Sequence, residues 1–233
     1  MKQYTRFDGQ SVLIWGYGRE GRSMERFLAT YCHPREVAVF EGKREDIDES
    51  KYDCILKSPG IVMDDDNPKY SSMTEVFLTE FRDQVIGVTG TKGKSTTSAM
   101  LAHVLGACLP QKVILLGNIG RPCLDYFGEI DRDTVIVFEL SCHQLAHLRV
   151  SPHVAVFLNL FEEHLDYYRT VERYFAAKCN IARFQSADDF FYVGTQVPPI
   201  ETAARTTGIE FAGAPDFGLQ VLGEHNNYNA EFV

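Results

Sequence analysis

The chain has 233 residues, of which 45% are hydrophobic, and its formal net charge is −9. This composition predicts one or two globular domains, and the acidic balance provides no broad basic face for a nucleic-acid backbone or an anionic membrane. The longest apolar runs have the length of strands and no signal-peptide core follows the N-terminus, so we expect a cytoplasmic monomer without nucleic-acid or membrane partners. The six cysteines are scattered without a C-x-x-C pair, which predicts reduced thiols and no zinc site.

The N-terminal part of the chain predicts a first α/β unit. A short apolar strand at 11–15 leads into a Gly-x-Gly-x-x-Gly turn at 16–21, which is followed by an amphipathic segment. A second strand, 36–40, ends at Glu41, close to the place where a dinucleotide-binding fold puts its ribose-binding acid. Taken alone, this pattern suggests NAD.

A third strand, predicted over 52–57, runs into the turn Ser58-Pro59-Gly60. In a parallel sheet this turn lies at the same carboxyl edge as the Gly-rich turn. One mononucleotide could bind there instead of a dinucleotide, and the residues of this unit leave both alternatives open.

The stretch 85–97 predicts a phosphate-binding loop, because an apolar β-branched run feeds a Gly-rich turn that ends in Lys94-Ser95 and opens a helix. The glycines of the turn allow the backbone to aim its N–H groups at an anion, Lys94 supplies a mobile cation, and Ser95 offers a hydroxyl to Mg²⁺. The spacing departs from the standard pattern, since Val88 stands where the first glycine is expected. A chance turn is the alternative, but the strand before it and the helix after it favour a nucleoside triphosphate site.

From position 84 onward, apolar strands alternate with helical segments, which predicts a second parallel sheet. The predicted strands cover 85–89, 113–116, 134–138, 154–158, 189–193, 209–212 and 219–222, and the predicted helices cover 94–106 and 171–184. We therefore expect two domains, 1–83 and 84–233.

Two side chains that follow strands of the second sheet are candidate metal ligands. Glu139 comes directly after strand 134–138, at the edge where the phosphate loop also lies, and an acid at this place is the usual second contact to Mg²⁺. It could instead cap a helix or face solvent. His164 follows the next strand, and a purely structural histidine is the alternative there.

Lys178 lies in the middle of the apolar stripe of the helix predicted over 171–184. Its stem could carry the ammonium to water along the helix surface. Alternatively, removal from water lowers the pKa of the amine, and a neutral amine can react or become the precursor of a metal ligand.

Six ordered motifs carry a resemblance to a known family. They are Gly90-Thr91-Lys92-Gly93-Lys94-Ser95-Thr96, Gly117-Asn118-Ile119-Gly120, Glu139-Leu140-Ser141-x-x-Gln144-Leu145, Asn159-x-x-Glu162-x-His164-x-Asp166, Ala176-Ala177-Lys178 and His225-Asn226-x-x-Asn229. From about residue 10 to its end, the chain resembles the first two domains of the Mur ligase family. The Glu-Leu-Ser form and the turn Ser58-Pro59-Gly60-Ile61 point to the D-glutamate-adding member.

The resemblance implies an α/β fold with two parallel-sheet domains, a Rossmann-like UDP-binding domain over 1–83 and a P-loop ATPase-like Mur ligase central domain over 84–233. It implies a ligase of peptidoglycan precursor synthesis that uses ATP and Mg²⁺ to add D-glutamate to UDP-N-acetylmuramoyl-L-alanine through an acyl phosphate. It also implies that the chain stops where a third, carboxyl-terminal domain should begin, so that we expect an incomplete enzyme.

The resemblance further assigns roles to individual residues. Lys178 would be carbamylated and join His164 at a second Mg²⁺, while Ser95 and Glu139 attend the first. Catalysis is expected from Lys94, His164 and Lys178. ATP is expected on Gly90, Thr91, Lys92, Gly93, Lys94, Ser95, Thr96 and Asn229. The UDP-sugar substrate is expected on Gly16, Gly18, Glu41, Ser58, Gly60, Asn118, Ser141 and Gln144.

Some residues depart from the family pattern. Cys142-His143 stands where the family usually has Ser-Phe, and Phe161 replaces a usual Thr or Ser, which leaves the expected metal ligands intact. Three alternative functions stay open: a nucleotide- and UDP-sugar-binding fragment without turnover, another member of the family, and an NAD-dependent oxidoreductase. The last would leave the phosphate loop unexplained.

Overall fold

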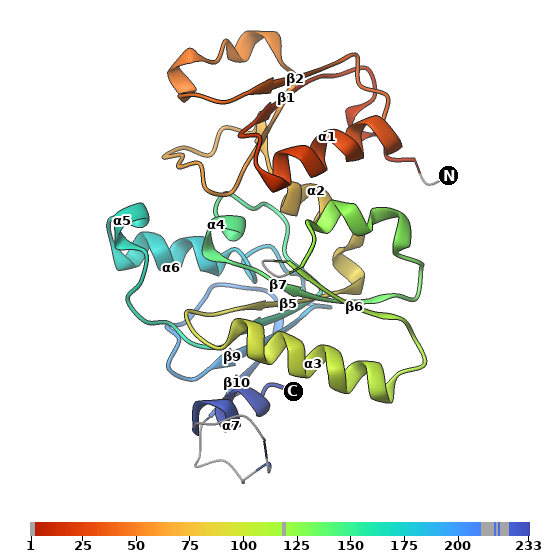
Figure 1. Cartoon of the computed structure of the whole chain (residues 1–233). Helices are drawn as coiled ribbons and strands as arrows, with labels where there is room; N and C mark the ends of the chain where they lie inside the picture. The colour runs from red at the N-terminus through yellow and green to blue at the C-terminus, as the bar shows by residue number, and fades with distance from the viewer. Residues whose placement is uncertain (1–2, 118–119, 211–216, 218, 220–223) are drawn as a thin grey trace. The chain divides into compact units, whose positions relative to one another are not determined.

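The computed structural model describes residues 3–117, 120–210, 217, 219 and 224–233 (Figure 1). The chain forms two compact units, which are described here one at a time. Unit 1 comprises Met1–Phe77 and Arg121–Ile130, and unit 2 comprises Leu78–Gly120 and Asp131–Val233. The division falls within helix α2 (Met73–Phe81), whereas the sequence placed it at 83/84.

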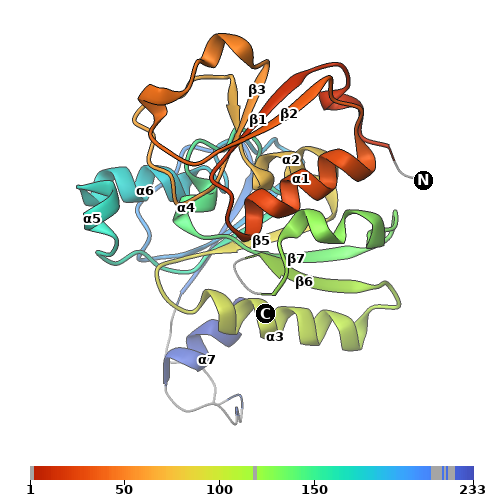
Figure 2. The ribbon, with the colours of Figure 1, turned by 45° about the horizontal axis from the view of Figure 1, so that its top comes forward.

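Unit 1 is built on a four-stranded parallel sheet in the order β2-β1-β3-β4 (Figure 2). Its elements are β1 (Ser11–Trp15), α1 (Arg19–Tyr31), β2 (Glu36–Phe40), β3 (Cys54–Lys57) and β4 (Tyr70–Ser71). Strand β1 is buried over its whole length, because it is flanked by β2 and β3 and its apolar side chains pack on both faces of the sheet. The carboxyl ends of β1 and β3 therefore present their turns at one edge.

Unit 1 takes in a segment that lies much later in the sequence. The short helix η5 (Cys123–Glu129) packs against α1, where the Asp125 carboxylate accepts hydrogen bonds from Ser23 Oγ at 2.7 Å and from Arg26 at 2.9 Å. The buried ring of Phe127 lies 4.9 and 4.8 Å from two aromatic rings of α1. The domain division of the sequence does not include this contribution.

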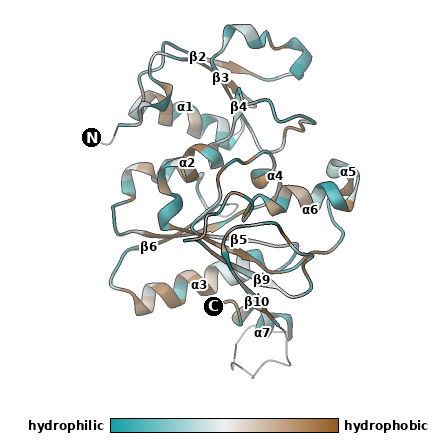
Figure 3. Ribbon diagram, turned by 180° about the vertical axis from the view of Figure 1, so that it is seen from behind, coloured by the Kyte–Doolittle hydropathy of each residue, from teal (hydrophilic) through white to brown (hydrophobic). Residues whose placement is uncertain are grey.

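Unit 2 contains a six-stranded parallel sheet in the order β10-β9-β8-β5-β7-β6. The strands are β5 (Val85–Thr89), β6 (Val113–Gly117), β7 (Val135–Glu139), β8 (Val154–Phe157), β9 (Phe190–Gly194) and β10 (Arg205–Ile209). The helices are α3 (Lys94–Cys108), α4 (Cys142–Leu145), α5 (Leu165–Tyr168), α6 (Val171–Cys179) and α7 (Glu224–Ala230). Helix α3 covers one face of the sheet, and α4 and α6 lie on the other side (Figure 1). Hydrophobic residues concentrate in the central strands (Figure 3), as in other sheets covered on both faces.

Most predicted elements of unit 2 are found within a few residues of their expected positions. The helix predicted over 171–184 is an exception, because α6 ends at Cys179 and the following residues form turns. Hydrogen bonds from Ile181 N to Lys178 O and from Asn180 Nδ2 to the carbonyl of Leu145 replace the helical pattern there. The strand predicted over 209–212 was placed too late in the chain, since it shares only Ile209 with β10, and its last two residues lie outside the described residues. The strand predicted over 219–222 also falls mostly outside the described residues.

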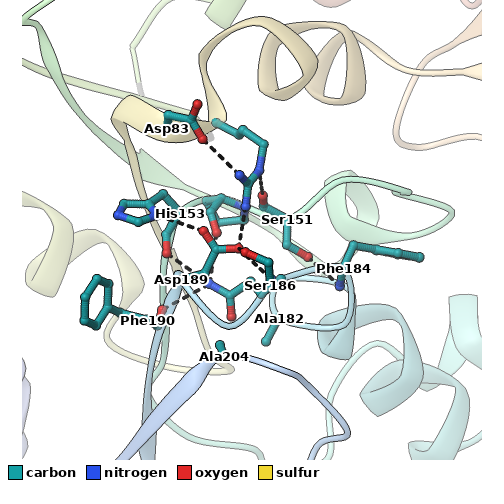
Figure 4. A network of polar contacts seen from close by, with 12 residues as sticks. Asp83, Ser151, His153, Ala182, Phe184, Ser186, Asp189, Phe190 and Ala204 are labelled. Atoms are coloured by element: carbon teal, nitrogen blue, oxygen red, sulfur yellow. Dashed lines mark hydrogen bonds and ion pairs between the residues drawn. The ribbon is translucent and has the colours of Figure 1, made fainter.

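A buried carboxylate joins three segments of unit 2 (Figure 4). The side chain of Asp189 is 2% exposed and accepts hydrogen bonds from Arg82 at 2.6 Å and from Ser186 N at 2.6 Å, and it lies 2.8 Å from His153 Nδ1. Burial raises the pKa of Asp189, but the hydrogen bonds from Ser186, His153 and Arg82 outweigh it and leave the pKa below its ordinary value. The ionised carboxylate therefore ties the segment before β5 to the starts of β8 and β9.

Within the described part of the chain, we find no helix that combines the length and the apolar character needed to cross a membrane.

Candidate functional site

The phosphate loop leaves β5 and enters α3 through a left-handed glycine. Gly93 has φ +83° and precedes the first residue of α3. A Cβ atom at this position would lie 2.3 Å from Oδ1 of Asn229 in α7. Both the backbone conformation and the close approach of Asn229 therefore require glycine. The structure thus brings the predicted loop and the predicted Asn229 into contact.

The side chain of Asn159 holds the loop in place. Its Oδ1 accepts hydrogen bonds from the backbone N–H groups of Thr91 and Lys92 at 3.1 and 2.9 Å, and its Nδ2 donates to the Lys92 carbonyl at 3.0 Å. Asn159 is 5% exposed, so these bonds are sheltered from water. Asn159 is not among the site residues that the sequence predicts, although its position directly after a predicted strand is a usable signal.

Lys94 and Ser95 occupy the first turn of α3. Lys94 Nζ donates hydrogen bonds to the carbonyls of Gly90 and Thr91, both at 3.0 Å, and so spans the loop. Ser95 is exposed. The helix N-terminus, the loop N–H groups and the lysine together form a site suited to a phosphate group.

A cavity of about 1100 Å³ opens beside the loop in unit 2. It is lined by Lys92, Gly93, Thr96, Asn159, Phe161, Thr195, Gln196, Glu210, His225, Tyr228 and Asn229. The cavity is large enough for a nucleotide, and its lining combines the aromatic side chains of Phe161 and Tyr228 with a majority of polar side chains. Asn229 itself is 2% exposed and donates through Nδ2 to Asn226 Oδ1 at 3.2 Å.

Glu139 ends β7, and its backbone pairs with Val88 of the neighbouring strand β5. The residue is 1% exposed, and its Oε2 atom is buried without a hydrogen-bond partner among the described residues. A buried carboxylate oxygen normally has a partner, and a hard cation such as Mg²⁺ would supply one. The buried carboxylate oxygen of Glu139, unpartnered in the described part of the chain, therefore fits a hard cation such as Mg²⁺.

His164 precedes α5 in a left-handed conformation, with φ +57°, and its side chain is 43% exposed. Its Nε2 lies 3.7 Å from the carboxylate of Glu163, which also forms an ion pair with Lys92 at 2.7 Å. The hydrogen bond from Lys92 lowers the pKa of Glu163. Among the described residues, no group of three His, Cys, Asp or Glu side chains is arranged to hold a metal ion.

Lys178 is buried, with 1% exposure, and it does not reach water along the helix surface. Its Nζ donates to the Gly90 carbonyl at 2.7 Å and lies 4.9 Å from the centre of the Tyr174 ring. Burial lowers the pKa of Lys178 to about 7, and nearby Lys94 acts in the same direction. The amine is therefore substantially neutral near pH 7 and directly behind the phosphate loop.

This burial predicts a pH dependence of stability. Between pH 7 and 10 the unfolded state binds a proton at Lys178 that the folded state lacks, so this residue makes the free energy of unfolding rise with pH. In Lys178→Met that rise is expected to be missing, whereas the exposed Lys112→Met control keeps it. Denaturant unfolding in bicarbonate-free buffer across this range measures the slopes, and equal slopes for all three proteins would contradict the assignment.

The remaining predicted residues of unit 2 lie at the start of α4. Ser141 and Gln144 form a reciprocal capping box, in which Ser141 Oγ accepts from Gln144 N at 3.3 Å and Ser141 N donates to Gln144 Oε1 at 3.1 Å. Their side chains bond to each other in this structure. Asn118 lies outside the described residues.

The predicted substrate residues of unit 1 gather at the carboxyl edge of its sheet. Gly16 has φ +90°, and Ser58 Oγ donates to its carbonyl at 2.9 Å, so the turns after β1 and β3 touch. Gly18 precedes α1, Gly60 is exposed in the turn after β3, and Glu41 is exposed directly after β2. This edge is open to a ligand.

A family model described as the Mur ligase middle domain matches residues 88–206. Two curated relatives carry the name UDP-N-acetylmuramoylalanine–D-glutamate ligase. The one from Streptococcus agalactiae serotype III is 33% identical over 240 residues, which cover 89% of this chain and 52% of that protein. The one from Leuconostoc mesenteroides is 30% identical over 218 residues, which cover 81% of this chain and 48% of that protein. The chain thus spans about half the length of the curated relatives it matches.

Solved structures show the same fold. A UDP-N-acetylmuramate:L-alanyl-gamma-D-glutamyl-meso-diaminopimelate ligase from Neisseria meningitides has a TM-score of 0.58 at 18% identity and covers 96% of this chain and 91% of that chain. The MurF ligase of Thermotoga maritima, solved in complex with ADP, has a TM-score of 0.51 at 18% identity. The match covers 91% of this chain and 51% of that chain. At these identities the likeness concerns the fold alone.

Proposed function

The chain belongs to the Mur ligase family, and we propose that it forms the nucleotide-binding part of an ATP-dependent amide-bond ligase. The names of the curated relatives support the finer proposal that D-glutamate is added to UDP-N-acetylmuramoyl-L-alanine in peptidoglycan precursor synthesis. The protein would act in the cytoplasm, as a monomer, on these small-molecule substrates. Unit 1 would bind the UDP group, and unit 2 would bind ATP.

One observation carries the proposal: three chemically unusual groups meet at the same edge of unit 2. The phosphate loop is preformed by Asn159, Glu139 leaves a buried carboxylate oxygen unpartnered among the described residues, and the buried amine of Lys178 lies 2.7 Å from the Gly90 carbonyl of the loop. A simple binding module needs only the first of these. Phosphoryl transfer would use the loop and a cation held by Glu139, because charge develops on the transferred group, and a carbamylated Lys178 would supply a further carboxylate for a cation.

The residues of this chain would have separate roles in the reaction. Lys94 would leave its loop carbonyls and bind the terminal phosphate of ATP, while Ser95 and Glu139 would hold Mg²⁺, which supplies charge neutralisation when bound. The γ-phosphoryl group would pass to the carboxylate of the UDP-sugar substrate. The amine of D-glutamate would then attack the acyl phosphate, forming the amide bond and releasing phosphate.

Thermal unfolding with separate ligands tests this function. ATP with Mg²⁺ is expected to raise the melting temperature, UDP is expected to raise it independently, and NADH is expected to leave it unchanged, because only ligands of the native state stabilise it. A ligand at a hundred times its Kd adds about 2.7 kcal/mol. Protection by NADH alone, or equal protection by NADH and UDP, would favour the oxidoreductase alternative instead.

We further propose that CO₂ carbamylates Lys178, because only a neutral amine reacts with CO₂ and the burial of this side chain favours that form. The product is a carboxylate, which a hard cation binds. Incubation with ¹³C-bicarbonate and Mg²⁺ is expected to give one carbamate carbonyl resonance, and a crystal structure at neutral pH should show planar density on Nζ. Persistence of the resonance in Lys178→Met, or a bare lysine in that crystal structure, would refute the modification.

A further inference from the structure

Two imidazole rings lie next to each other at the start of α4 and before α5 in unit 2. The ring centroids of His143 and His164 are 5.2 Å apart, and the ring planes meet at 76°. We propose that His143 and His164 together bind one divalent cation of borderline character, such as Co²⁺, Ni²⁺ or Zn²⁺, in preference to Mg²⁺.

The separation of the rings suits a shared cation. Each imidazole nitrogen binds such an ion at about 2.1 Å, and the ring centre lies roughly 1 Å behind that nitrogen. A tetrahedral angle at the ion then places the two ring centres roughly 5 Å apart. The observed centroid distance of 5.2 Å agrees with this value, so the backbone already holds His143 and His164 close enough.

Neighbouring groups orient both rings. The Cys142 sulfur lies 3.5 Å from Nδ1 of His143, and the Tyr167 ring packs edge-on against His143 with centroids 4.4 Å apart. On the other ring, Glu163 lies 3.7 Å from Nε2 of His164 and adds negative charge near the pair.

The donor type decides which cation is preferred. Mg²⁺ favours oxygen ligands in octahedral geometry, whereas imidazole nitrogen suits the first-row transition metals and zinc. Two imidazole donors at one site therefore favour a transition metal or zinc over Mg²⁺. Because no larger cluster of His, Cys, Asp or Glu is preformed in the described part of the chain, water would complete the coordination in the ligand-free protein.

The inference deepens the proposed function, since it concerns the cation expected at His164, but the pair can bind a metal without ATP. The simplest competing account is that His143 only packs, as phenylalanine would, in the aromatic cluster with Tyr167 and Tyr168. The variant His143→Phe separates the two accounts, because it keeps an aromatic ring and removes the nitrogen donors.

Titration of the reduced protein with Co²⁺, followed by calorimetry and visible absorption, tests the pair. The wild-type protein is expected to bind one Co²⁺ tightly, and His143→Phe is expected to raise the Kd at least tenfold. His143→Gln, which keeps a polar side chain, should weaken binding to a similar extent. His103→Phe, a change of an exposed histidine on α3, should leave the Kd unchanged.

Two outcomes would overturn the proposal. One is an equal Kd for the wild type and His143→Phe, both shown to be folded by thermal unfolding. The other is a loss of Co²⁺ affinity in Cys142→Ser as large as in His143→Phe, together with a sulfur-to-metal charge-transfer band in the wild type. These two results would show that the thiol binds the metal. The ligase proposal is tested by a separate measurement, the response of the melting temperature to ATP and Mg²⁺. If ATP with Mg²⁺ gives no stabilisation, the ligase proposal fails, but the Co²⁺ titration still tests the histidine pair.

Discussion

Lys94→Ala is expected to weaken ATP–Mg²⁺ binding roughly tenfold to hundredfold while leaving the fold nearly intact. The Lys94 ammonium donates hydrogen bonds to two loop carbonyls at 3.0 Å each, and its half-buried side chain is not part of the hydrophobic core. A charge-assisted contact to phosphate is worth about 1.5–3 kcal/mol, or roughly a tenfold to hundredfold change in Kd. Calorimetric titration with ATP and Mg²⁺ measures the loss.

The matched control is Lys112→Ala, which removes an equal charge from an exposed position of unit 2 and should bind ATP like the wild type. UDP binding should be unchanged in both variants, because unit 1 holds the residues expected to bind it. If Lys94→Ala binds ATP normally but unfolds at a much lower temperature without ligand, Lys94 has a structural role and the interpretation of the loop is wrong.

Asp189→Asn is expected to lower the free energy of unfolding by about 3 kcal/mol at neutral pH. The carboxylate is 2% exposed and bonds to Arg82, Ser186 and His153, so the neutral amide loses several charge-assisted hydrogen bonds. The estimate of about 3 kcal/mol is at the low end for breaking a buried ion pair, because the Arg82 side chain is 29% exposed and keeps part of its hydration. Urea unfolding measures the difference.

The same substitution predicts a pH dependence. The pKa of Asp189 is lowered in the folded state, so its contribution is fully present above the unfolded pKa of about 3.9 and disappears as the pH falls through the folded value. The gap between wild type and Asp189→Asn should therefore be constant from pH 6 to 8 and close in acid. Asp188→Asn, a change at a 95% exposed neighbour, should cost little at any pH. A gap that persists at pH 2 would point to packing instead of charge.

The sequence by itself determined the local features of this protein. Alternating apolar runs predicted parallel strands, the Gly-rich turn before Lys94 predicted the phosphate loop, and the apolar stripe of its helix placed Lys178 at a core-facing position. The stripe left open whether the ammonium reaches water, and the structure shows that it is buried. Each of these depends on residues a few positions apart, where backbone geometry and periodicity relate sequence to structure directly. The family resemblance rests on the same short motifs.

Only the tertiary structure decided which distant side chains meet. The Asn159 side chain accepts a hydrogen bond from Lys92 N, which is 67 positions away in the sequence, and Asp189 forms an ion pair with Arg82, which is 107 positions away. The segment Arg121–Ile130 packs into unit 1 although its neighbours in sequence belong to unit 2. No local pattern encodes such contacts, because they depend on where the sheet order brings separate loops together, and a single asparagine or aspartate in a loop carries no periodic signal. The sequence also does not predict the proximity of His143 and His164, because each of them, taken alone, resembles an ordinary histidine in a loop or at a helix end.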